Sequence, residues 1–244
     1  MDLTTSAYIL LCCTALFMGI SKTGVPGFGL IFVVLAPLAI PAKVSTGYIL
    51  PFLIFGDIIA VLWWRKAAVW RLIGAVMPAM LTGIVIGYFI MGRVDDAIYG
   101  RVLGGVVLFL LLLDELRRFT GTEVKAGNKL IGWSIGLIAG IMTMMANAAG
   151  PVVMLYLLAM NVSKEEFVGT GAWIYLFINV FKVPFSMNLG LITMESLKVN
   201  FMMLPLVILG SFLGVYIMRR IPTGIFMKLM RVIALIGGAK LLFF

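Results

Sequence analysis

The chain of 244 residues is 63% hydrophobic and 12% charged, and it carries a net charge of +9 at neutral pH. A soluble domain of this size could not bury so much apolar surface, so the composition indicates a polytopic membrane protein. The basic residues are typical of loops that fix membrane orientation, and no basic patch with interleaved aromatic residues predicts nucleic-acid binding. Because the chain has no histidine and its two cysteines are adjacent in an apolar run, we expect no metal site, no cofactor and no enzymatic activity.

Apolar segments follow one another along the chain in two sets, separated by a polar stretch. The first set covers about residues 8–20, 29–40, 47–64, 72–92 and 98–114. The second covers about 131–145, 149–160, 168–189, 199–218 and 225–244. We predict an all-α polytopic membrane protein with a first repeat over residues 1–116, a cytoplasmic linker over 117–129 and a second repeat over 130–244.

The two halves resemble each other in sequence. MPAMLTGIVIGYFIMGRV, at residues 77–94, aligns without gaps with LPLVILGSFLGVYIMRRI, at residues 204–221. Glycines and prolines stay in register over much of each half, which indicates an internal duplication. The aligned pairs include Pro78 with Pro205, Gly83 with Gly210, Gly87 with Gly214, Gly19 with Gly140 and Gly29 with Gly150.

The glycine-rich segment Met18–Gly29 interrupts the first apolar region and decides the topology. Residues 8–40 are too long for one ordinary span and too short for two, because a span needs about 20 residues. If the segment is a kink, the lysines and arginines of the loops divide as nine against eight between the two faces; if it is the tip of a re-entrant hairpin, they divide as twelve against five. The positive-inside rule favours the hairpin.

With hairpins, each repeat consists of one broken helical hairpin and three transmembrane helices, about eight to ten membrane segments in all. Each repeat then crosses the membrane an odd number of times, so the second repeat is inverted relative to the first. Both termini are expected outside, and the linker is expected in the cytoplasm.

A hairpin tip inside the membrane presents free backbone N–H groups at the start of its returning helix, and such groups favour anions. A helix from Tyr8 to Ile20 would rise only about 20 Å and stop short of the far face of a core about 30 Å thick. The second repeat would place an equivalent tip nearby. We therefore predict a substrate site formed by Ser21, Lys22, Thr23, Gly24, Gly27 and Gly29 from the first tip and by Thr143, Asn147, Ala148 and Gly150 from the second.

Charged residues inside the later apolar segments extend this prediction. Lys182 precedes Pro184, and Asn179 lies on the same helix face three residues before Lys182, so both are expected to bind substrate. Lysine also snorkels readily, so Lys22 and Lys182 could each reach water at a helix end instead. Asp57 is the acid placed well inside a span; it could exchange protons and couple them to transport, or it could form a structural ion pair with either lysine.

The segments GISKTGVPGFGLIFVVLAP and GLIAGIMTMMANAAGPVVMLYLL resemble the paired glycine-rich segments of the TauE/SafE family of sulfite and organosulfonate exporters. The resemblance implies proton-linked outward transport of small sulfur-containing anions, such as sulfite and sulfoacetate, across the bacterial cytoplasmic membrane. The residues alone indicate only a small anion, so an anion channel, or a carrier of another oxyanion or a carboxylate, is the alternative. The expected partners are the anion, membrane lipid and, if the chain forms a homodimer, a second copy.

Overall fold

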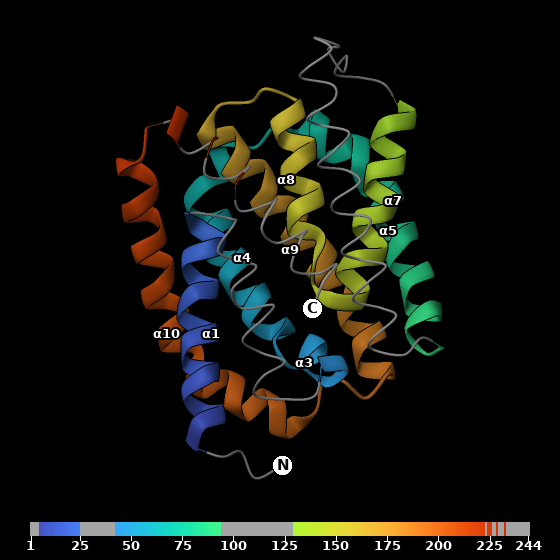
Figure 1. The fold of residues 1–244 in the computed structure, drawn as a ribbon, viewed down its shortest axis with the longest axis vertical. Coiled ribbons are helices and arrows are strands. Elements are labelled where there is room, and N and C mark those ends of the chain that lie inside the picture. Colours follow the sequence, from blue (N-terminus) through green and yellow to red (C-terminus); the bar gives the residue numbers. More distant parts are fainter. Residues whose placement is uncertain are drawn as a thin grey trace.

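The computed structural model describes residues 5–24, 42–93 and 129–222, together with residues 224, 225, 228 and 232. The described chain is helical (Figure 1), with α1 (Thr5–Thr23), α3 (Ala42–Tyr48), α4 (Leu50–Trp64), η2 (Arg65–Ala67), α5 (Trp70–Met91), α7 (Lys129–Ala146), α8 (Ala149–Ala159), α9 (Lys164–Asn188) and α10 (Met194–Arg220). The predicted segments at 29–40 and 98–114, most of that at 225–244 and most of the linker lie outside the described residues. The division into repeats therefore stays a prediction.

Five stretches of the described chain are long and apolar enough to cross a membrane. They are Thr5–Thr23, Val44–Ala67, Trp70–Met91, Lys164–Asn188 and Met194–Arg220. Together they make the chain a multi-pass membrane protein, as the composition predicted. Large apolar side chains such as Phe201 and Phe212 lie exposed on α10, where they can face lipid.

Several helix boundaries lie away from the predicted ones. The prediction that the first helix ends at Ile20 is wrong: α1 continues to Thr23 and has 19 residues, a rise of about 28 Å. The starts of α9 and α10 come four and five residues earlier than expected, because Ser163 and Thr193 each form a capping box with the residue three positions later. The end of α1 therefore lies nearer to the far end of the bundle than predicted.

Two pairs of helices run parallel and in close contact, α1 with α10 and α5 with α7 (Figure 1). Each contact is formed by backbone against backbone. A Cβ atom at Gly19 would collide with the carbonyl oxygen of Val207 on α10, and one at Gly210 would collide with that of Leu16 on α1. Small residues at four-residue spacing allow such close approach between membrane helices.

The α5–α7 pair repeats these contacts at the aligned positions. A Cβ atom at Gly140 would collide with the carbonyl oxygen of Met80, and one at Gly83 would collide with that of Leu137. In the sequence alignment, Gly140 corresponds to Gly19 and Gly83 to Gly210. Residues that align between the two halves thus make equivalent contacts in the structure.

The second hairpin lies within the described chain. The outer end of α7 lies beside the start of α5, because Gly132 approaches the carbonyl oxygen of Ala75. The outer part of α8 lies there too, since the Tyr156 hydroxyl donates to the carbonyl oxygen of Leu72 at 3.1 Å. The chain therefore enters the bundle along α7, breaks at Asn147, and returns along α8 to the end from which it came (Figure 1).

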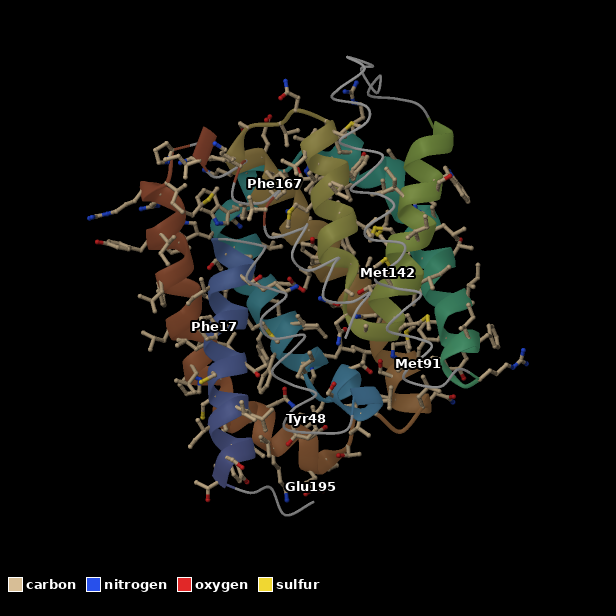
Figure 2. The ribbon with its side chains drawn as sticks, viewed as in Figure 1. Phe17, Tyr48, Met91, Met142, Phe167 and Glu195 are labelled. Carbon is tan, nitrogen blue, oxygen red and sulfur yellow. The ribbon has the colours of Figure 1, made fainter. Side chains whose placement is uncertain are left out.

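Helices α4 and α9 run antiparallel through the middle of the bundle and join the two parallel pairs. Gly169, near the start of α9, packs against Trp64 and Ala67 at the end of α4. The main apolar core lies between α5, α7, α8 and α9, and it includes Met142 and Phe167 (Figure 2). This core holds α7 and α8 against α9, which positions the polar side chains described next.

Candidate functional site

A buried ion pair links α1 to α4. Lys22 Nζ lies 2.7 Å from Asp57 Oδ1, and the two side chains are 9% and 0% exposed. Gly56 leaves room for the lysine, because a Cβ atom there would lie 2.9 Å from Lys22 Cγ. On the other oxygen of the carboxylate, Asn179 Nδ2 from α9 donates to Oδ2 at 2.6 Å. Burying two charges is costly unless their other atoms are also satisfied, and Asn179 supplies part of that compensation.

A second buried cation lies one helical turn further along α9. Lys182 is 1% exposed. Its ammonium group donates to Thr143 O and Thr143 Oγ1, both at 3.1 Å, and to Asn147 Oδ1 at 2.6 Å. These acceptors lie at the C-terminal end of α7, where unpaired carbonyl groups and the helix dipole attract a cation. Within the described chain, no carboxylate lies within 4.0 Å of Lys182, so neutral oxygens alone hold this charge.

Asn147 forms the break between α7 and α8. Its φ angle of 54° ends α7 in the left-handed conformation, which asparagine adopts more readily than other residues with a side chain. Its side chain accepts from Lys182 and donates through Nδ2 to the carbonyl oxygen of Thr46 at 2.8 Å. A single amide thus connects the hairpin tip to α9 and to α3.

Tyr175, which was not among the predicted residues, links Lys22 to the start of α8. Lys22 Nζ lies 4.5 Å from the centre of the Tyr175 ring, which is within the range of a cation–π contact. The hydroxyl group of Tyr175 donates to Gly150 O at 3.5 Å, beside the start of α8. Tyr175 lies four residues before Asn179 and seven before Lys182, and this helical spacing could have revealed it.

The remaining predicted residues divide into three groups. Thr23 and Gly24 hold α1 against α10, since Thr23 Oγ1 donates to Ser211 O at 2.6 Å and Gly24 packs on Gly214. Three residues lie at the helix ends next to the polar cluster formed by Lys22, Asp57, Asn179 and Lys182. They are Ser21 in the last turn of α1, and Ala148 and Gly150 around the start of α8. Gly27 and Gly29 lie outside the described residues.

The start of α8 keeps the features predicted for an anion-binding tip. Its N-cap residue, Ala148, has no side chain that could cap the first amide groups. A Cβ atom added at Gly150 would meet none of the described residues within 4 Å. Lys182 reaches this break directly through Asn147, and Lys22 reaches it through Tyr175. Two lysine side chains are therefore connected to one helix break, and the Asp57 carboxylate lies against the first of them.

Comparison with known proteins assigns this architecture to a family. The sequence matches the family model described as sulfite exporter TauE/SafE over residues 11–241, which is nearly the whole chain. No curated protein and no solved structure matches it. The family consists of membrane transporters and not of enzymes. The multi-pass chain with two helix-break lysines therefore belongs to the TauE/SafE family of sulfite exporters.

Proposed function

We propose that the chain is a proton-linked secondary transporter that exports small sulfur-containing anions, such as sulfite, sulfoacetate or other organosulfonates. The observation that carries the proposal is Lys182, a fully buried ammonium group whose three acceptors are all neutral oxygens. A buried charge without a counter-ion is costly, so an anion that takes the place of one of these oxygens is favoured. Family membership supplies the sulfur chemistry, and the cluster supplies the positive charge.

Alternating access requires parts that can move relative to each other, and an inverted repeat provides them. Two observations support this architecture. The parallel pairs α1–α10 and α5–α7 run in opposite directions along the bundle (Figure 1). Their closest contacts also involve residues that align between the two halves. In the proposed transporter, each pair combines one helix from each repeat, and the substrate site lies between the pairs.

The charges at the helix ends support an orientation in the bacterial cytoplasmic membrane. Lys164 Nζ donates to the carbonyl oxygen of Ile221 at 3.1 Å, so the start of α9 and the end of α10 lie together, next to η2. This end carries Arg65, Lys66, Arg71, Lys164, Arg219 and Arg220, whereas Arg93 and Lys198 lie at the opposite end. Under the positive-inside rule the basic end faces the cytoplasm, which leaves the start of α1 outside. The C-terminus lies beyond the described residues, and its position outside stays a prediction.

Cysteine accessibility tests this orientation. In a background with Cys12 and Cys13 replaced by alanine, we expect Arg65→Cys and Lys164→Cys to react with a membrane-impermeant maleimide only after the membrane is opened. Lys198→Cys should react in intact cells, because it lies at the opposite end of the bundle. Labelling of Arg65→Cys and Lys164→Cys from opposite sides would contradict the hairpin topology.

Transport in liposomes tests the function itself. We expect an imposed pH gradient to drive accumulation of radiolabelled sulfoacetate by the purified, reconstituted chain, and we expect unlabelled sulfite to compete. Taurine, which carries no net charge, is the control. It should compete poorly, because we expect the site to select its ligands by their charge. Flux that follows only the anion gradient would identify a channel, and lack of any anion flux would refute the proposal.

A further inference from the structure

The charges of the cluster do not cancel. Lys22 forms an ion pair with Asp57, and Lys182 makes the three contacts with oxygen that an ammonium group can make, so we count two cations and one anion. Asp57 and Lys182 are buried, and the Lys22 side chain is 9% exposed. Asp57 is close enough to both lysines to interact electrostatically with each of them. Among the described side chains, the helices packed against α4 add no other charge at this level: α9 contributes the uncharged Tyr175 and Asn179, and the charges of α10 lie at its ends. The cluster therefore has a surplus of one positive charge.

From this surplus we infer that the site accepts a monoanion while Asp57 is ionised, and that a dianion binds only together with one proton, which Asp57 takes up. The inference rests on the function proposed above and defines its substrates by charge. A monoanion neutralises the cluster. A dianion would turn the surplus of one positive charge into a surplus of one negative charge. Its own desolvation cost is also far higher, because that cost rises with the square of the charge.

The geometry shows where the proton would act. Asp57 Oδ1 contacts Lys22 Nζ, whereas Oδ2 accepts from Asn179. A proton taken from solution onto Oδ1 replaces the contact with Lys22 and leaves the contact with Asn179 in place. Lys22 is then free to face the anion together with Lys182, and the surplus rises to two positive charges. No bond other than this O–H bond is formed, and nothing is oxidised or reduced.

Two sulfonates of nearly equal size separate the charge states. 2-Hydroxyethanesulfonate is a monoanion, and sulfoacetate is a dianion. Titration calorimetry of the purified full chain, in two buffers of different ionisation enthalpy at one pH, counts the protons taken up on binding. We expect about one proton more per sulfoacetate than per 2-hydroxyethanesulfonate. The Asp57→Asn variant should lose this difference, and its preference should shift towards sulfoacetate by about tenfold.

Glu165→Gln is the matched control, because it removes an exposed carboxylate on α9 far from the cluster. It should leave the difference in proton uptake unchanged. If the original chain binds sulfoacetate without taking up a proton, the inference that a dianion binds together with a proton is wrong, whether or not the variants fold. The proposed transport function would not be affected by that result. Proton uptake that persists in a folded Asp57→Asn variant would also overturn the inference about charge. If the chain binds neither sulfonate, both the proposed function and the inference about charge are refuted.

Discussion

Replacing Lys182 with glutamine is expected to weaken anion binding about a hundredfold, because one charged hydrogen bond in a buried site contributes about 3 kcal/mol. The same change should not lower the melting temperature of the ligand-free protein. Glutamine can still donate to one of the acceptors at the end of α7, and the cost of a buried charge without a counter-ion disappears. Calorimetry with sulfoacetate and thermal unfolding without ligand measure the two effects.

A loss of anion affinity without a loss of stability separates a binding role of Lys182 from a structural one. A lysine that only held α9 against α7 would lose stability when replaced, with anion affinity unchanged in the remaining folded protein. Lys164→Gln provides the matched control on the same helix, since Lys164 lies at the basic end and contacts the carbonyl groups that end α10. It should leave the affinity unchanged. Unaltered affinity in a folded Lys182→Gln variant would exclude Lys182 from the site.

The second large effect is expected at the helix contacts. Gly83→Ala and Gly210→Ala each place a methyl group against a backbone carbonyl of the facing helix, where no side chain can move aside. We expect each to cost about 3 kcal/mol or more, because overpacking against backbone forces the helices apart. A marked fall in melting temperature and in the yield of monodisperse protein would report this loss.

Gly74→Ala is the control for these variants. Gly74 lies on α5, the helix that carries Gly83, but a Cβ atom there would meet none of the described residues within 4 Å. Alanine at this position should be neutral or slightly stabilising. Equal stability of the Gly83→Ala and Gly74→Ala variants would contradict the close α5–α7 contact. Similar losses for Gly83→Ala and Gly210→Ala would support the equivalence of the two halves.

Much of the fold follows from sequence signals that act over short distances. The hydrophobic segments predicted most helices, and the helix break around Asn147 was expected from the alignment of this segment with the glycine-rich segment of the first half. The capping boxes at Ser163 and Thr193 could have been identified from their spacing, and they would have corrected the starts of α9 and α10. The extension of α1 to Thr23 could not have been identified from the sequence, because it depends on the contact of Thr23 with α10.

The sequence singled out most residues of the buried polar cluster but not their pairing. Lys22, Asp57, Asn179 and Lys182 were all expected to take part, and the structure brings them together. Which lysine pairs with Asp57 depends on how α1, α4 and α9 are rotated against each other, and no local signal encodes this. The structure shows a pair with Lys22; proton coupling by Asp57 stays a prediction.

The glycine contacts also bear on how the bundle can rearrange. Backbones that interlock without intervening side chains cannot slide past one another by rotamer changes, so α1 with α10 and α5 with α7 should each behave as a rigid unit. Within the described helices, rearrangement is then expected along α4 and α9, where polar contacts such as that of Asp57 with Asn179 accompany the packing of Gly169 on α4. An anion that competes for those polar contacts would loosen the bundle along this seam.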